Sequence, residues 1–336
     1  YNNQSLRKFD EIEILMQIMQ HKFKRVIQSK MMPIFSTNSG KFQKISEIPF
    51  KLEKDLQKMT EDNLDEIFNL DFITSEFQLS GLRIDTLGFD KETNSFVIIE
   101  YKRDKSFSVI DQGFAYLSLL LNNKAEFILA YNENNSTSLK KQDIDWSQSR
   151  VIFVANSFTS YQKMAIGFRD LPMELYEVKQ YSNKTILFNQ VQSPEKYESI
   201  NKLGSKSEMV QSVSREIKTY SEEYHYEKFG SPNIISIYED LRDKIQNLGD
   251  DVKIVFRKNY IAFKSKTNFV YFNMQRSSIH IDVSLKINEL EDPRKILRDM
   301  SKTGHYGAGF SRISIKKKED IQYAMFLIEQ AYTKLS

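Results

Sequence analysis

The 336-residue chain contains no cysteine, which excludes disulfides, thiolate zinc sites and cysteine nucleophiles. Its four histidines are scattered at positions 21, 225, 280 and 305, which does not favour a histidine-rich metal site or a histidine-based nuclease. A metal site in this chain would therefore use oxygen ligands, which suit Mg²⁺ or Mn²⁺. The absence of cysteine also fits a reducing cytoplasm, the location that we expect.

Long apolar runs are absent as well. A membrane-spanning helix needs about 18 or more consecutive apolar residues, and the longest apolar stretch, at 115–121, is too short. We therefore expect no membrane contact. Hydrophobic residues make up 40% and charged residues 28% of the chain, which is typical of a globular protein, and the length is sufficient for two domains.

Charge is distributed unevenly along the chain. Residues 251–336 hold 16 lysines and arginines against 9 aspartates and glutamates, whereas residues 1–250 hold 32 against 36. A basic C-terminal region beside a carboxylate-rich region suits a polyanion held near a metal site. A solvated basic surface explains the same distribution equally well.

Hydrophobic periodicity predicts alternating helices and strands over the first 190 residues. An amphipathic helix is expected at 6–28, followed by a short irregular or strand-like piece and a second helix at 51–70. The further expected strands are 82–90, 95–103, 126–131, 150–155, 173–178 and 185–190, with helices at 107–121 and 158–169.

The C-terminal part has a different pattern. Residues 193–207 are rich in Ser, Lys, Pro and Gly, which indicates a linker. Helices are then expected at 208–225 and 233–247, strands at 253–257, 260–265, 269–274 and 279–285, a helix that starts at Pro293, a short strand and a final helix at 318–334.

The pattern with the most chemical content is Asp85, then Glu100-Tyr101-Lys102, then a helix with Gln112 and Tyr116. If residues 91–94 form a hairpin turn, Asp90 pairs with Ser95 and Asp85 lies directly opposite Glu100. Cross-strand partners lie within about 5.5 Å of each other, so the two carboxylates would share one ion. Such an ion would polarise a phosphodiester and lower the pKa of a water molecule.

The remaining residues of the pattern have supporting roles. Side chains alternate along a strand, so Lys102 faces the same side as Glu100 and can reach the attacking water or a phosphate. Gln112 and Tyr116 are four residues apart and share a helix face. Glu53, on an earlier helix, is the preferred third acidic residue, with Glu61 and Glu66 as alternatives. Each part alone is also typical of a solvated surface, and the prediction rests on their joint occurrence in this order.

In these residues the chain resembles the PD-(D/E)XK nuclease superfamily, in the RecB-like branch with a Gln-x-x-x-Tyr motif that is similar to NucS-type endonucleases. Ile84 stands where the family pattern has proline. The resemblance implies an α/β fold with a restriction-endonuclease-like core, a mixed sheet flanked by helices, and Mg²⁺-dependent hydrolysis of DNA with Mn²⁺ as a substitute. Restriction, phage defence and DNA repair are the roles that it implies. The rival hypothesis is a non-catalytic nucleic-acid-binding or assembly module that retains this fold.

The predicted organisation is a helical extension (1–31), a nuclease domain (32–195), a linker (196–207) and a smaller α+β domain (208–336) that binds DNA or a regulatory protein. A homodimer through the extension is a further hypothesis. We interpret the stretch from Gly304 to Gly309 as a glycine-rich connection rather than a catalytic loop. The strands of the last domain carry basic candidates for nucleic-acid contact, interleaved with Tyr260, Tyr271 and Phe272. These candidates are Arg257, Lys258, Lys264, Lys266 and Arg276.

Overall fold

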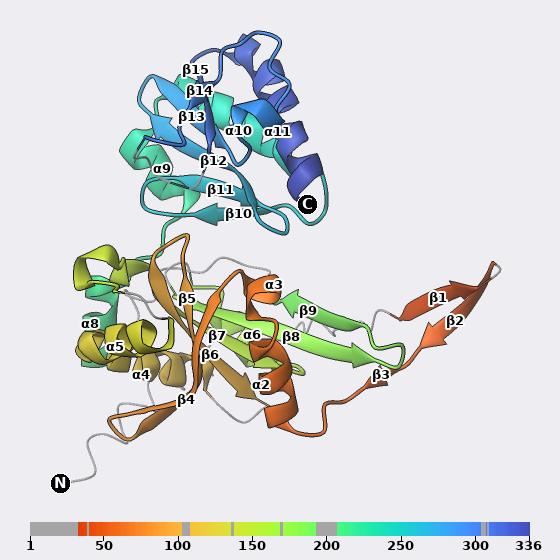
Figure 1. Cartoon of the computed structure of the whole chain (residues 1–336), viewed down its shortest axis with the longest axis vertical. Helices are drawn as coiled ribbons and strands as arrows, with labels where there is room; N and C mark the ends of the chain where they lie inside the picture. Colours follow the sequence, from red (N-terminus) through yellow and green to blue (C-terminus); the bar gives the residue numbers. More distant parts are fainter. Residues whose placement is uncertain are drawn as a thin grey trace, which may run out of the picture. The chain divides into compact units, whose positions relative to one another are not determined.

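The chain folds into two units that divide between Lys218 and Thr219, as seen in a computed structural model (Figure 1). The structure describes residues 33–38, 40–102, 108–135, 138–168, 171–192, 207–303, 307 and 309–336. The helix predicted at 6–28, most of the predicted linker and the segment 304–306 lie outside these residues. The observed division lies eleven residues after the predicted start of the second domain at 208.

The first unit is built around a seven-stranded mixed sheet with the order β3-β8-β7-β6-β5-β4, in which β9 also pairs with β8. Strands β6, β7 and β8 are parallel to one another, and β4 and β5 are antiparallel additions beside β6. The elements are β1 (Ile34–Asn38), β2 (Lys41–Ile45), β3 (Glu47–Ile48), α2 (Glu53–Glu61), α3 (Leu64–Phe68), β4 (Asp71–Leu79), β5 (Leu82–Asp90), β6 (Ser95–Lys102), α4 (Val109–Asn122), α5 (Lys124–Asn135), η1 (Lys141–Asp143), η2 (Trp146–Gln148), β7 (Arg150–Ala155), α6 (Ser160–Ala165), β8 (Met173–Tyr181), β9 (Ile186–Gln190) and α8 (Glu208–Glu216).

Helices cover both faces of this sheet, so β6 is buried on both sides. Phe96 and Ile98 of β6 pack with α4, α5 and α8, whereas Val97 and Ile99 pack with α2 and α3. This two-sided burial explains why residues 96–99 form a continuous apolar run. Helix α8 belongs to the core of the first unit, because it packs against α4 and its Val210 and Val213 are buried in the same apolar core.

The second unit contains a six-stranded antiparallel sheet with the order β10-β11-β12-β13-β15-β14. Helices α10 and α11 pack on one face through an apolar core that includes Leu241, Phe272 and Leu327. Its elements are α9 (Glu222–Phe229), α10 (Pro232–Gln246), β10 (Lys253–Phe256), β11 (Ile261–Lys264), β12 (Asn268–Gln275), β13 (Ser278–Val283), η3 (Ile287–Glu289), β14 (Arg298–Asp299), β15 (Ser311–Ile315), η4 (Lys318–Asp320) and α11 (Ile321–Leu335).

Most predicted elements of the first unit are confirmed, with three corrections. The strand predicted at 126–131 is wrong, because this segment lies within α5 and buries Phe127, Ala130 and Tyr131 at helical spacing. The single helix predicted at 51–70 is two helices, α2 and α3. Strand β4 was not predicted, because it has a bulge and a residue with positive φ, Glu76, so its apolar residues do not alternate.

Two predictions for the second unit are also wrong. The segment at 208–225 contains two helices, because α8 ends at Glu216 and the side chain of Ser221 accepts a hydrogen bond from Tyr224 N at the start of α9. No helix starts at Pro293. Instead, the Asp292 carboxylate accepts the backbone N–H of Leu297 at 3.0 Å, and Lys295 has a φ of 53°, which breaks a helix.

None of the helices that the structure describes is long and apolar enough to cross a bilayer.

His225 is a fully buried titratable group of the second unit. It is 0% exposed, its Nε2 lies 2.8 Å from the carbonyl oxygen of Arg257, and its Nδ1 is buried without a hydrogen-bond partner. Burial lowers the pKa of His225 from 6.5 to about 4, with a smaller contribution from the charge of Lys228. The native state therefore holds a neutral imidazole whose Nε2–H donates to the carbonyl.

This depressed pKa predicts acid sensitivity of the second unit. Below pH 6.5 His225 becomes protonated in the unfolded state, whereas in the native state it stays neutral down to about pH 4. The free energy of unfolding therefore decreases as the pH falls from 6.5 to 4. The loss amounts to about 3 kcal/mol. His225→Gln keeps an N–H donor and should remove this slope, as measured by hydrogen exchange of β11 and β12 in urea. An unchanged slope in the variant would assign the acid sensitivity to other groups.

Candidate active site

The hairpin formed by β5 and β6 positions the two carboxylates that the sequence singles out. Its register runs from Asp90 opposite Ser95 to Thr86 opposite Ile99, as predicted. Asp85 and Glu100 are the next residues on their strands. The backbone N–H of Tyr101 donates to Asp85 Oδ2 at 3.0 Å, which fixes the Asp85 carboxylate at the end of β6.

Glu100 is 3% exposed and accepts three side-chain hydrogen bonds. Lys102 Nζ lies 2.6 Å and Gln112 Nε2 lies 2.8 Å from Glu100 Oε1, and the Tyr116 hydroxyl lies 2.9 Å from Glu100 Oε2. A buried carboxylate is costly unless donors surround it, so these contacts explain how the charge is tolerated. The structure thus brings three residues of the sequence motif around the carboxylate of a fourth.

Helix α4 is placed so that Gln112 and Tyr116 reach β6. The Ser108 side chain accepts a hydrogen bond from Asp111 N and begins the helix. Gly113 faces Met173 of β8 so closely that a Cβ atom would lie 2.4 Å from the Met173 side chain. A larger residue at 113 would displace the flexible end of the Met173 side chain, so glycine allows α4 to lie close to β8 without this rearrangement.

Tyr116 is a fixed hydrogen-bond donor in this arrangement. Its hydroxyl also lies 3.1 Å from the carbonyl oxygen of Arg83 and 3.1 Å from Gln112 Nε2. Burial raises the pKa of Tyr116 well above its usual range, and the charge of Glu100 raises it further. The phenol therefore stays protonated and can donate to Glu100.

Asp85 is in an environment that disfavours its charge. It is 7% exposed, and burial together with the negative charge of Glu100 raises its pKa from 3.8 to about 7. The Tyr101 N–H and Lys102 oppose this shift, while Glu53 adds to it. Two carboxylates share the positive charge of Lys102, so the site has an excess of negative charge.

The third acidic residue is placed by helix α2. Among the three alternatives, the charge of Glu53 contributes to the raised pKa of Asp85. Glu61 accepts from Thr86 Oγ1 at 2.5 Å and from Gln57 Nε2 at 3.0 Å, and Glu66 is exposed on α3. These positions favour Glu53 for the role.

Gln57 is a residue that the sequence analysis missed. Its side chain is 7% exposed, and its Nε2 donates to the carbonyl oxygen of Asp85 and to Ser75 Oγ, both at 3.0 Å. Gln57 lies four residues after Glu53 on α2, so the i, i+4 spacing of these two polar residues was the available signal. It ties α2 to the strand that carries Asp85.

The donor set suits a hard divalent cation. Asp85 and Glu100 offer carboxylate oxygens in a setting with excess negative charge, and Mg²⁺ prefers oxygen ligands. Over the described ranges no three His, Cys, Asp or Glu side chains are grouped so as to hold a metal ion. The residues therefore fit a cation bound through two carboxylates, with Glu53 nearby and water as the remaining ligands.

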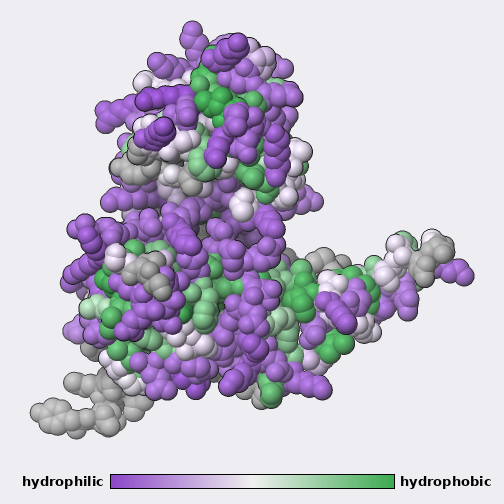
Figure 2. Space-filling model, in the orientation of Figure 1, coloured by the Kyte–Doolittle hydropathy of each residue, from purple (hydrophilic) through white to green (hydrophobic). Residues whose placement is uncertain are grey.

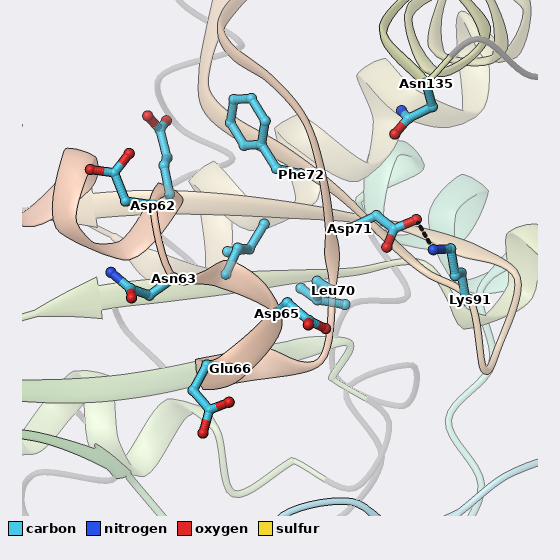
Figure 3. Close-up of a pocket in the computed structure, with 11 residues that line it drawn as sticks. Asp62, Asn63, Asp65, Glu66, Leu70, Asp71, Phe72, Lys91 and Asn135 are labelled. Atoms are coloured by element: carbon cyan, nitrogen blue, oxygen red, sulfur yellow. Dashed lines mark ion pairs between the residues drawn. The ribbon is translucent and has the colours of Figure 1, made fainter.

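A cavity of about 580 Å³ lies elsewhere on the first unit, beside α3 and the start of β4 (Figure 3). Asp85, Glu100 and Glu53 do not line it, although the two alternatives for the third acidic residue, Glu61 and Glu66, do. Five carboxylates and one amine, Lys91, line it, and Lys91 Nζ forms an ion pair with Asp71 at 2.7 Å. A phosphate would meet repulsion there, so we place the candidate chemistry at Asp85 and Glu100. The carboxylates belong to Glu61, Asp62, Asp65, Glu66 and Asp71.

The basic candidates of the second unit do not form one patch. Lys258 and Arg276 lie in the β10–β11 and β12–β13 turns, at one end of the sheet. Lys264 ends β11 and Lys266 follows in the next turn, at the opposite end of the sheet. Arg257 is half-buried, and its Nε has no hydrogen-bond partner.

The interleaved aromatic residues are also unavailable for stacking. Tyr260, Tyr271 and Phe272 are 8%, 3% and 0% exposed. Phe272 packs in the apolar core with α10 and α11, whereas Tyr260 and Tyr271 pack edge to face against each other with ring centroids 5.4 Å apart. A stacking platform needs open rings.

Comparison with known proteins identifies one close relative. An uncharacterized protein of Haemophilus influenzae is 41% identical over 300 residues, which cover 89% of this chain and 99% of the relative. Residues 222–334 match the family described as Domain of unknown function (DUF5655), so this match falls within the second unit.

Two solved structures match smaller parts of the chain. A repair endonuclease from Pyrococcus abyssi is 20% identical, with 36% of this chain and 45% of that chain covered and a TM-score of 0.22. The EndoMS–dsDNA2 complex is 18% identical, with 39% and 47% covered and a TM-score of 0.23. The chain thus spans less than half the length of either solved chain.

The raised pKa of Asp85 predicts that Asp85→Asn stabilises the metal-free protein. Native Asp85 keeps a proton that the unfolded state loses above about pH 4, so stability falls as the pH rises from 4 to 7. Asparagine removes the cost of ionising a buried carboxyl. In urea unfolding with chelator at pH 8, the variant should have a free energy of unfolding about 1–4 kcal/mol higher than the wild type, and this difference should disappear near pH 4.

Asp90→Asn is the matched control. Asp90 is equally buried, but Arg150 NH1 donates to it at 2.9 Å, together with the N–H groups of Glu92 and Thr93. Its replacement should destabilise the protein at pH 8 because Arg150 loses part of its compensation. If Asp85→Asn lowers the free energy of unfolding at pH 8, the charge of Asp85 does not destabilise the native protein and the prediction is wrong.

Proposed function

The chain belongs to the family of the Haemophilus influenzae protein, and we propose that it is a metal-dependent nuclease that hydrolyses phosphodiester bonds in DNA. The observation that carries the proposal is the buried pair Asp85 and Glu100, with Lys102 bonded to Glu100 at 2.6 Å. A structural ion pair in a protein interior is normally balanced in charge. Here two carboxylates share one lysine, which is the arrangement that a divalent cation would complete.

In this proposal Asp85 and Glu100 hold Mg²⁺, with Mn²⁺ as a substitute and Glu53 as a further ligand, directly or through water. When bound, such an ion supplies Lewis acidity toward the phosphate and lowers the pKa of a water molecule. The chain contributes a fixed orientation of the ligands. Gln112 and Tyr116 hold the Glu100 carboxylate, and Gln57 and the Tyr101 N–H hold the strand and side chain of Asp85.

Lys102 has two functions in the proposed mechanism. Its side chain is 22% exposed, so the ammonium group can leave its contact with Glu100 and face a substrate phosphate. Its positive charge would then stabilise the negative charge that develops on the phosphate and orient the attacking water. Restriction, phage defence and DNA repair are the settings that we propose for this activity.

Cleavage assays test the proposal. The wild type should cut at least one of plasmid, linear duplex and single-stranded DNA when Mg²⁺ or Mn²⁺ is added, and chelation should stop the reaction. Glu100→Gln and Lys102→Ala should each lower the rate by about 100-fold or more, because one removes a ligand charge and the other removes the cation that faces the phosphate. Glu53→Gln should also slow the reaction if Glu53 is a ligand.

Glu66→Gln and Lys163→Ala serve as controls. Glu66 is exposed on α3, and Lys163 forms an ion pair with Glu177, so both should cut at the wild-type rate. Thermal unfolding provides a second readout: Mg²⁺ should stabilise the wild type and leave Glu100→Gln unchanged. A wild type that binds DNA but does not cut it under any of these conditions would favour the non-catalytic binding module.

A further inference from the structure

Strands β1 and β2 form a hairpin that is separate from the main sheet. They pair only with each other among the described residues, as a two-stranded sheet (Figure 1). An isolated two-stranded hairpin is only marginally stable in water. We therefore expect its exposed side chains to be polar unless the hairpin binds something. In Figure 2 hydrophobic residues interrupt the hydrophilic surface along this ribbon.

One face of this hairpin is aromatic. The register pairs Phe35 with Lys44 and Thr37 with Phe42, and directly opposed residues share a face, so these four side chains lie on the same side. Phe35 is 47% and Phe42 is 77% exposed, and their ring centroids are 6.1 Å apart. We call these four residues the hairpin face.

The charge around the hairpin face has one sign. Residues 33–46 contain Lys41 and Lys44 and no aspartate or glutamate. If a second copy paired with this face about a twofold axis, Lys44 of each chain would approach the same aromatic cluster and repel the other. A polyanion with flat apolar groups complements two exposed rings and a lysine better, because rings stack on bases and lysine neutralises a phosphate.

We propose that the hairpin face binds an unpaired stretch of DNA, with bases stacked on Phe35 and Phe42 and a phosphate at Lys44. The identity of the polyanion as DNA rests on the proposed function of Asp85 and Glu100. Unpaired DNA is the form that fits, since the bases of a duplex are stacked on one another and do not offer their faces to a protein ring. The hairpin is therefore a substrate-binding element outside the candidate active site.

Binding without metal tests this proposal separately from cleavage. A labelled oligothymidylate is titrated with the full chain in chelator, and anisotropy reports the dissociation constant. Phe42→Ala should weaken binding about 5- to 150-fold, the range for one lost base–aromatic stack. Lys44→Gln should reduce the salt slope of binding by about 0.7.

Matched variants control for exposure alone. Phe326 is 37% exposed on α11, so Phe326→Ala removes an exposed ring elsewhere. Lys58 is 76% exposed beside Asp62, so Lys58→Gln removes a lysine whose charge is already balanced. Neither change should alter the affinity or the salt slope. Equal effects of Phe42→Ala and Phe326→Ala would overturn the proposal, as would equal weakening of duplex and single-stranded binding.

The absence of native cysteine allows a direct footprint. Thr37→Cys introduces the only thiol of the chain on the hairpin face and keeps both rings, so oligothymidylate should slow its alkylation several-fold, whereas the thiol from Phe326→Cys should react at an unchanged rate. Slow alkylation before DNA is added would mean that a second copy or the segment 1–32 covers the face, and would overturn the proposal. Protection of the introduced thiol by DNA, together with a wild type that does not cut, would support the hairpin proposal and reject the nuclease proposal. A wild type that cuts, together with an unprotected thiol, would do the reverse.

Discussion

The buried carboxylate of Glu100 is the constraint on which the arrangement of the first unit depends. It lies near the end of β6, directly after four fully buried residues, so its charge must be compensated locally. The compensation comes from Lys102 on the same strand and from Gln112 and Tyr116 on α4. Helix α4 must therefore lie close to the sheet, which the glycine at 113 permits, and must begin early enough for Gln112 to lie in its first turn.

The site of Asp85 and Glu100 differs from a buried carboxylate whose charge is balanced. In the second unit Asp282 is 0% exposed, and it is matched by Arg312, whose NH2 lies 2.7 Å from Asp282 Oδ2, and by Asn273 Nδ2 at 3.2 Å from the same oxygen. That site has one negative and one positive charge, as a structural pair should. The site of Asp85 and Glu100 has one cation for two carboxylates and a carboxyl whose pKa is raised to about 7. An imbalance of this kind destabilises the fold, and such strain is typical of a site that binds a ligand.

The parts of the site that the sequence could predict are those set by short-range geometry. Strand alternation and a four-residue turn fix the register from Asp90 to Thr86, and the helical period places Gln112 beside Tyr116. Parts that depend on tertiary packing could not be predicted. Gln57 reaches the carbonyl oxygen of Asp85 only because α2 packs over the end of β5, and β4 is extended despite its irregular pattern because β5 offers it a partner. In the second unit Tyr260, Tyr271 and Phe272 are buried. A sequence pattern of basic and aromatic residues does not reveal whether the aromatic rings are exposed or buried.

Electrostatics also explains why a nuclease of this design would need two kinds of contact with its substrate. A phosphodiester that approaches Asp85 and Glu100 meets two carboxylates and one ammonium group, and like charges a few ångströms apart repel strongly in a buried setting. Affinity at this site therefore depends on a bound cation. Affinity at the hairpin face does not, because its rings and Lys44 attract a strand without metal. DNA binding at the hairpin face would then not depend on metal, whereas cleavage at Asp85 and Glu100 would require it.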